Sequence, residues 1–253
     1  IENPLNAGLT TVDASGSTQQ VTFSVQNDGA SSATNLDGGS ASDRIEGGDN
    51  NDTIDGNGGS DTLDGEGGND VINGGAGNDI LLGLEGNDTM DGGADHDNLY
   101  GGAGNDSQTG GTGVDYIDTG FFADGAGTEF VDAGADNDTV QTRGEFLVGR
   151  SAATGNDLTP NPAGSATNVD VLGGGEGTDT LRITGSTADT RGLNDVTGFE
   201  NIQLNSGTFN LVIDNFNATE SAFEADHDGR VAGGGYTTID GTGAGGTVLV
   251  NAS

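Results

Sequence analysis

The chain of 253 residues contains no cysteine, no tryptophan and no lysine, and only three prolines. The absence of cysteine excludes disulfides and thiolate metal sites, and two histidines offer little for zinc or copper. No run of about 18 apolar residues is present, so the sequence predicts no membrane span. The net charge of −35 argues against nucleic acid as a partner.

Recognisable catalytic motifs are missing as well. The chain has no H-E-x-x-H zinc motif, no G-x-S-x-G nucleophile elbow and no lysine-bearing phosphate loop. His227 is a lone histidine in an acidic loop, and His96 takes a place that asparagine usually holds in the repeat described below. Carboxylates are so numerous that no pair singles out a glycosidase site. The sequence therefore predicts that the chain is not an enzyme.

Glycine is abundant, at 50 residues, and it accompanies a nine-residue repeat. An apolar side chain follows two residues after each aspartate of the repeat, with Gln108 as the exception. These aspartates are Asp43, Asp52, Asp61, Asp70, Asp79, Asp88, Asp97, Asp106 and Asp115. A fixed short period indicates one structural unit stacked on itself. Alternation such as Thr53-Ile54-Asp55 predicts a short strand with one face inward.

The chemistry of this unit suits a hard cation. Aspartate brings a short charged oxygen ligand, and glycine allows the sharp turns that point carbonyl oxygens inward. Calcium takes roughly six to eight such oxygens in flexible geometry, whereas magnesium demands a tighter octahedron. Carboxylates stacked about 5 Å apart, the spacing of adjacent strands, would repel one another without a cation. Because the chain is only 30% hydrophobic, we expect calcium binding and folding to be one event.

Segments such as GEGGNDVIN from Gly65 and GGAGNDILL from Gly74 resemble the RTX nonapeptide GGxGxDxUx, where U is large and apolar. The resemblance covers residues 38–118. It implies an all-β fold, a right-handed parallel β-roll in which two nonapeptides make one coil. It also implies calcium between the loops of repeats n and n+2, about seven ions or more, and unfolded export through a type I secretion channel to the extracellular space.

The rest of the chain predicts further β structure. The expected domains are an N-terminal β cap or arm (1–37), the calcium β-roll (38–141), a linker or insertion (142–168), and a second short RTX turn with a C-terminal β-solenoid or sandwich-like region (169–253). Asp138 resumes the repeat pattern after a break, and Asp170 and Asp179 are nine residues apart, so these three are further candidate metal ligands. Residues 216–226 are compatible with one short helix.

Two functional classes stay open. The stretch DTLRITG from Asp179, followed by TGFENI from Thr197, resembles segments of RTX-bearing bacterial surface-layer proteins and large secreted RTX proteins. That resemblance favours a secreted structural protein that folds on calcium and self-assembles, as a homo-oligomer or polymer, into a surface layer, filament or matrix. The alternative is a calcium-dependent adhesin segment or the non-catalytic module of a larger exoenzyme. A cell-surface polysaccharide is a further candidate partner.

Overall fold

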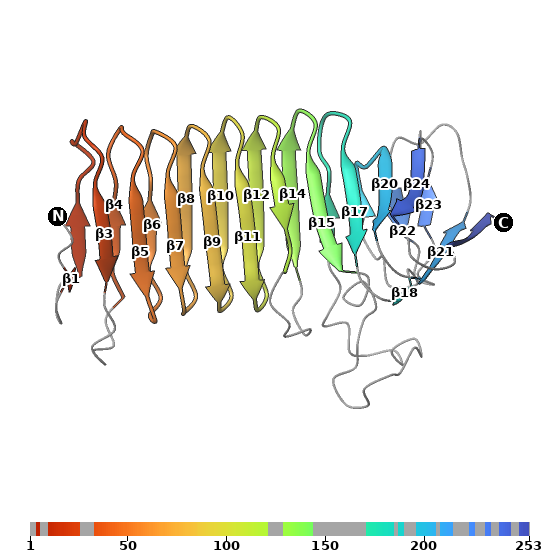
Figure 1. Ribbon diagram of the computed structural model, residues 1–253, viewed down its shortest axis with the longest axis horizontal. Coiled ribbons are helices and arrows are strands. Elements are labelled where there is room, and N and C mark those ends of the chain that lie inside the picture. Colours follow the sequence, from red (N-terminus) through yellow and green to blue (C-terminus); the bar gives the residue numbers. More distant parts are fainter. Residues whose placement is uncertain are drawn as a thin grey trace. The chain divides into compact units, whose positions relative to one another are not determined.

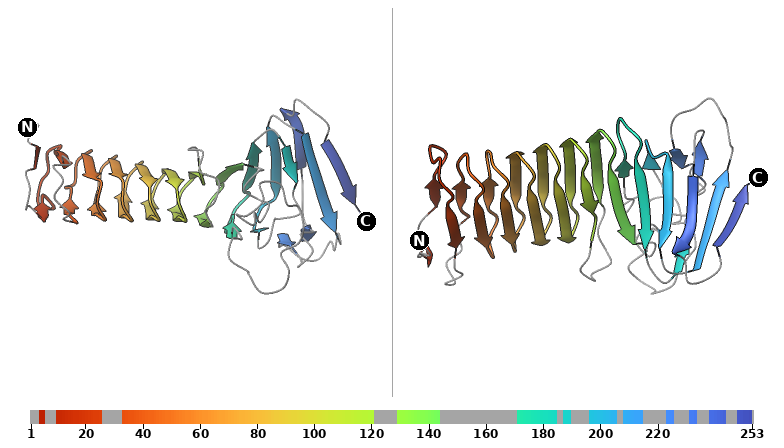
Figure 2. Two further views of the ribbon diagram at one scale, coloured as in Figure 1. Left: turned by 90° about the horizontal axis from the view of Figure 1, so that it is seen from below. Right: turned by 45° about the horizontal axis from the view of Figure 1, so that its top comes forward.

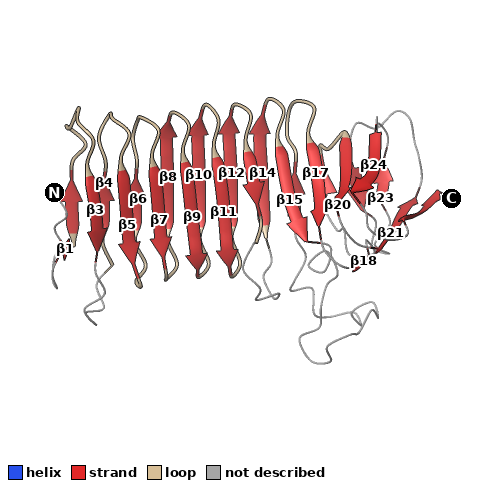
Figure 3. Ribbon diagram, in the orientation of Figure 1, coloured by secondary structure: helices blue, strands red, loops and turns tan. Residues whose placement is uncertain are grey.

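The structure is a computed structural model that describes most of the chain and contains two compact units, Ile1–Ala123 and Asp124–Ser253. The described residues are 4–5, 10–25, 33–120, 129–143, 171–184, 187–189, 196–205, 208–214, 223–225, 231–233, 238–243 and 248–252. They form strands, turns and bends, and none of them belongs to a helix that could cross a membrane. The predicted all-β parallel β-roll is confirmed (Figures 1 and 3).

In the first unit, successive strands alternate between two parallel sheets. One sheet contains β1 (Pro4–Leu5), β3 (Thr22–Val25), β5 (Arg44–Gly48), β7 (Thr62–Glu66), β9 (Ile80–Glu85), β11 (Asn98–Ala103) and β13 (Tyr116–Asp118). The other contains β2 (Thr11–Asp13), β4 (Asn35–Asp37), β6 (Thr53–Asp55), β8 (Val71–Ala76), β10 (Thr89–Ala94) and β12 (Ser107–Thr112). Figure 2 shows these strands as successive coils of one winding chain.

The register makes one coil of two nonapeptides. Leu63 pairs with Leu81 and Leu81 pairs with Leu99, so each strand lies beside the one 18 residues further on. Glycine permits the tight turns between the sheets. At Gly59, for example, φ is +119°, and an added side chain would meet the Ala41 backbone of the preceding coil at 2.5 Å.

The interior of the roll is a narrow column of single apolar side chains. Each is at most 1% exposed, and the column consists of Leu36, Ile45, Ile54, Leu63, Ile72, Leu81, Met90, Leu99 and Ile117. Phe23 pairs with Ile45 and Val12 with Leu36, so the coils before the first repeat extend the same stack. One apolar residue per nine is a thin core, so other interactions must contribute to holding the coils together.

Gln108 interrupts this column, and replacing it should stabilise the roll. Its side chain is fully buried and its Nε2 donates to the Asp118 carbonyl oxygen at 3.3 Å, but Oε1 has no hydrogen-bond partner among the described residues. A buried unsatisfied acceptor costs about 1–3 kcal/mol, and methionine has a similar shape. We expect Gln108→Met to raise the free energy of unfolding by about 1 kcal/mol in urea denaturation with saturating calcium. A loss of stability would mean that the bond to Asp118 outweighs the unsatisfied oxygen.

The strands of the second unit form three sheets, and their described pairs are parallel except for β22 with β23. One sheet contains β14 (Phe130–Ala135), β16 (Val171–Gly173) and β19 (Val196–Thr197), and another contains β15 (Thr139–Arg143), β17 (Thr180–Thr184), β20 (Asn201–Asn205) and β24 (Thr238–Gly243). The third contains β18 (Thr187–Asp189), β21 (Thr208–Asp214), β22 (Phe223–Ala225), β23 (Val231–Gly233) and β25 (Val248–Ala252). Apolar side chains fill the interior here too, among them Val140, Leu172, Leu181 and Ile202.

Two sequence predictions concern this unit: a short helix over 216–226 and a linker over 142–168. A helix over residues 216–226 is wrong for its described part, because β22 is a strand that pairs antiparallel with β23. The apolar alternation of Phe223-Glu224-Ala225 lets it join a sheet, and tertiary pairing overrides helix propensity. Most of the predicted linker, 142–168, lies outside the described residues, although β15 runs on to Arg143.

Candidate metal centre

Every aspartate of the repeat lies at the same point of its coil, directly before a strand. Asp79 precedes β9, and its carbonyl oxygen accepts the Asn98 amide of the next coil at 2.9 Å. The 18-residue coil therefore stacks odd repeats in one column and even repeats in a second. All nine predicted ligands of the first unit lie in these columns and are at most 3% exposed: Asp43, Asp52, Asp61, Asp70, Asp79, Asp88, Asp97, Asp106 and Asp115.

One carboxylate oxygen of each aspartate links neighbouring coils. The Asp61 amide donates to Oδ1 of Asp79 at 2.7 Å, and the Asp79 amide donates to Oδ1 of Asp97 at 2.8 Å. The even column repeats the bond, with the Asp70 amide 2.8 Å from Oδ1 of Asp88. These charge-assisted hydrogen bonds fix the orientation of each carboxyl group.

The other oxygen, Oδ2, faces a main-chain carbonyl of the next coil. A methyl group added to Gly74 would lie 2.6 Å from Asp79 Oδ2 and 2.6 Å from the Gly92 carbonyl oxygen. Two oxygens that can only accept hydrogen bonds thus converge on one point, which glycine keeps free of a side chain. The following Oδ2 atoms are buried and have no hydrogen-bond partner among the described residues: those of Asp52, Asp61, Asp70, Asp79, Asp88, Asp97 and Asp179.

The first aspartate of the column differs from the others. Asp43 also has its Oδ2 near a carbonyl oxygen, that of Gly56, but this Oδ2 accepts the Gly39 amide at 2.7 Å. The bond satisfies the oxygen without a cation. We therefore expect the loop of Asp43 to contribute less to cation binding than the interior loops.

Burial makes the aspartate columns electrostatically unfavourable on their own. Burial, with a smaller contribution from neighbouring carboxylates of the same column, raises the pKa of Asp70 and Asp79 to about 7. The pKa of Asp61 and Asp97 rises to about 6, again chiefly because burial disfavours the charged form. At neutral pH these groups need either a proton or a cation beside them.

The donor set fits calcium. No three histidine, aspartate or glutamate side chains gather as a metal-binding cluster in the part of the chain that the structure describes. Carboxylates must therefore share any ion with main-chain carbonyl oxygens, and Asp79 with the Gly92 carbonyl is such a pair. A mixed, all-oxygen set on flexible loops is what calcium accepts.

The second unit carries a shorter version of the same column. The Asp138 amide donates to Oδ1 of Asp179 at 2.8 Å, although the two residues are 41 apart in the sequence. Both side chains are at most 1% exposed. The structure thus brings these two predicted ligands together, whereas the third, Asp170, lies outside the described residues.

Stacked glycine-rich loops, each with a buried aspartate that faces carbonyl oxygens, define a calcium-binding repeat protein of the parallel β-roll class. Residues 37–72, 73–108 and 91–125 match the family model of the RTX calcium-binding nonapeptide repeat, which spans four copies. The segment 37–125 thus belongs to the RTX calcium-binding repeat family. No curated protein and no solved structure matches the chain.

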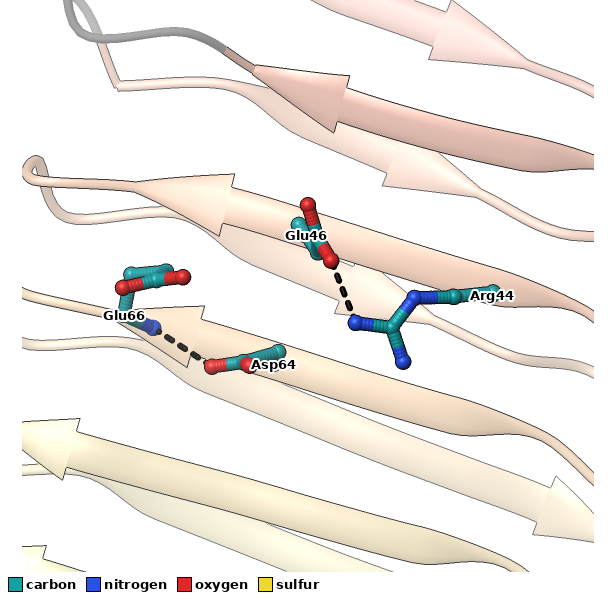
Figure 4. Close-up of polar contacts among 4 residues, drawn as sticks. All are labelled: Arg44, Glu46, Asp64 and Glu66. Atoms are coloured by element: carbon teal, nitrogen blue, oxygen red, sulfur yellow. Dashed lines mark hydrogen bonds and ion pairs between the residues drawn. The ribbon is translucent and has the colours of Figure 1, made fainter. Parts of the chain in front are cut away.

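Acidic residues on the outer face of the sheets have a different role, which sequence reasoning did not assign. Asp64 Oδ1 accepts the Glu66 amide at 3.2 Å (Figure 4), and Glu66 has a φ of 69° where most other repeats have glycine. Asp55 accepts the Asn57 amide at 3.0 Å in the same way, and Asn57 also has positive φ. The sequence signal for this role was an aspartate two residues before a position at which another residue replaces the glycine of the repeat.

Figure 4 also shows the Arg44 guanidinium donating to Glu46, and both residues lie on β5, the strand next to the β7 strand of Asp64. Burial, together with the nearby carboxylates of Glu66 and Glu46, raises the pKa of Asp64 to about 6. A raised pKa alone therefore does not mark a metal ligand. The inner aspartates are distinguished by an oxygen that faces a carbonyl and lacks a donor.

Proposed function

We propose that this chain is a secreted structural protein whose β-roll folds on calcium outside the cell and then self-assembles. The columns of buried Oδ2 atoms facing carbonyl oxygens carry the proposal, because they make the folded roll dependent on cations. Calcium sites of the extracellular type bind at about 10⁻⁴–10⁻³ M, so the chain would stay unfolded in the cytosol. That behaviour suits export through a type I secretion channel.

The proposed ion count follows from the loop geometry. Between Asp43 and Asp97, seven aspartates have Oδ2 close to the carbonyl oxygen of a glycine in the next coil of the same column. We infer about seven calcium ions in the first unit, each held by such an aspartate and by loop carbonyls and the one at Asp43 bound more weakly than the rest, with further ions at Asp138 and Asp179. Seven divalent ions would reduce a net charge of −35 to about −21.

Self-association is supported by two features of the outer surface. Among the described residues, β1 and β2 end their sheets, and an open strand edge is a natural surface for pairing with another chain. An acidic row also runs across β2, β4 and β6, where Asp13, Asp37 and Asp55 are in register. Burial and these two neighbours raise the pKa of Asp37. Copies of such a surface repel one another unless a divalent cation bridges them.

Catalysis is not part of the proposed function. The motifs of RTX proteases and lipases are absent from the sequence, and we assign the buried carboxylates of the aspartate columns to cation binding. A surface layer, filament or matrix of such chains would act by assembly. Anchoring to a cell-surface polysaccharide would be compatible with that role.

Light scattering during a calcium titration tests this function. We expect the chain to change from an expanded monomer in chelator to very large particles as calcium rises to about 10 mM, above the extracellular affinity range. Magnesium at equal ionic strength serves as the control and should produce neither compaction nor growth. Compaction to a stable monomer would overturn self-assembly and favour the adhesin segment or exoenzyme module instead.

A further inference from the structure

A glutamate continues the aspartate column of the second unit beyond the last nonapeptide. Glu200 directly precedes β20, as Asp179 precedes β17. The two strands are paired in register, with Thr180 beside Asn201 and Leu181 beside Ile202. Glu200 therefore holds the column position of an aspartate, although it lies 21 residues after Asp179 and outside the segment 37–125 that matches the RTX repeat.

The loop before Glu200 is three residues shorter than the loop before Asp179. Gly173 pairs with Thr197, which places Gly174 opposite Gly198. Asp179 lies five positions after Gly174 (179 − 174 = 5), whereas Glu200 lies only two positions after Gly198 (200 − 198 = 2). Within the short loop, Phe199 is buried, at 4% exposed, and holds the loop against the interior.

The longer side chain of glutamate compensates for the shorter loop. Oε2 of Glu200 accepts the Asp179 amide at 2.8 Å. This is the bond that Oδ1 of Asp179 makes with the Asp138 amide, also at 2.8 Å. The extra methylene group lets the carboxylate reach the same place from a backbone that has turned earlier.

The space between the two loops has the features of the nonapeptide sites. Asp179 is fully buried, and its Oδ2 has no hydrogen-bond partner among the described residues. A methyl group on Gly174 would collide with the Gly198 carbonyl oxygen and lie 3.0 Å from Asp179 Cβ. The Gly198 carbonyl oxygen and the Asp179 side chain thus both lie against the position that Gly174 leaves free, and the Glu200 carboxylate is bonded to the amide of the same Asp179.

We propose that Asp179, the Gly198 carbonyl and Glu200 form a calcium site that closes the second unit's column. Two carboxylates, one of them buried, place a charge of −2 against a carbonyl oxygen, and a divalent cation neutralises it with the oxygen ligands that calcium prefers. The inference rests on the proposed function for the identity of the ion. It adds a site in which a six-residue glycine loop is replaced by a short loop and a glutamate.

The test compares Glu200→Gln with a matched control in the full chain. Glutamine keeps the oxygen that accepts the Asp179 amide and removes only the charge. The control is Glu176→Gln, because Glu176 is exposed on the neighbouring loop. We expect equilibrium dialysis with radioactive calcium to show one ion fewer per chain for Glu200→Gln and no change for Glu176→Gln. Glu200→Asp should lose the same ion, because the shorter side chain cannot span the gap.

Hydrogen exchange locates the lost ion and guards against general unfolding. In Glu200→Gln with saturating calcium, we expect faster exchange over 180–184 and 201–205 and unchanged protection over 43–118. In the unaltered chain, protection over 201–205 should require calcium. An unchanged ion count in Glu200→Gln, or protection of 201–205 in chelator, would overturn the site. If the unaltered chain binds no calcium at all, the proposed function itself fails, which is a separate result.

Discussion

Asp79→Asn should remove at least one calcium ion and destabilise the calcium-saturated roll by about 3 kcal/mol. A site contributes about 2.7 kcal/mol when the ligand is at 100 times its dissociation constant, which holds at 10 mM calcium for a constant of about 10⁻⁴ M. Asn keeps an oxygen for the Asp61 amide, which lies 2.7 Å from Oδ1 of Asp79. Its amide would also face the Gly92 carbonyl as a donor, so the variant should still fold. Calcium titration calorimetry and urea denaturation measure the two effects.

The matched control for this variant is Asp91→Asn in β10, the next strand along the chain. Asp91 is exposed on the outer face, 12 residues from Asp79. The same change of charge should leave the ion count intact and alter stability by no more than about 0.5 kcal/mol. Equal losses in both variants would mean that net charge, and not ligation, decides stability. Full calcium stoichiometry in Asp79→Asn would refute the role of the column as ligands.

The period of the sequence predicted the fold because each nonapeptide contains the residues that determine its own strand and turn. Apolar residues such as Ile54 and Leu63 alternate with polar neighbours and fall on the inner side of each strand. Glycines provide the turns, and the aspartate register places the nine aspartates of the repeat in two columns. Local preference and global stacking agree in every repeat but that of Gln108, so the pattern alone was sufficient to predict the roll.

Features that depend on contacts between coils were not predictable in the same way. Glu200 is invisible to a nine-residue register, because its place in the column follows from strand pairing after a shortened loop. The bond from the Glu66 amide to Asp64 became clear only when the backbone of Glu66 was known to be left-handed. The imidazole of His96 accepts the Val114 amide at 2.7 Å, a contact 18 residues away in sequence. Each case requires knowing which coil lies next to which.

Removing calcium should unfold the roll at pH 8 and leave it substantially folded at pH 5.2. Without metal, burial raises the pKa of Asp70 and Asp79 from 3.8 to about 7, and of Asp61 and Asp97 to about 6. A raised carboxyl pKa favours the folded state while the group is protonated, so this stability is fully present below about pH 4 and is lost as pH rises through 6–7. One pKa unit corresponds to about 1.4 kcal/mol. At pH 8 the combined cost of ionising these four buried groups is therefore comparable to the free energy of unfolding of a whole domain, about 5–15 kcal/mol.

Calcium should reverse this dependence on pH, because protons and the cation compete for the same oxygens. With 10 mM calcium the roll should be most stable at pH 8 and weaken as pH falls through 7 and 6. Circular dichroism and hydrogen exchange over 43–118 can follow both series, and pH 5.2 stays above the isoelectric point of about 4.1, where the chain would precipitate. A variant with Asn at Asp61, Asp79 and Asp97 is the control. Its metal-free structure should depend less on pH, since that column then has no group that titrates between 6 and 7, and the dependence that remains should come from Asp70 and Asp64. Equal folding of the unaltered metal-free chain at pH 5.2 and pH 8 would show that the buried carboxylates do not govern the transition, and the stability of the coils would then have to come from the apolar column and the backbone ladders alone.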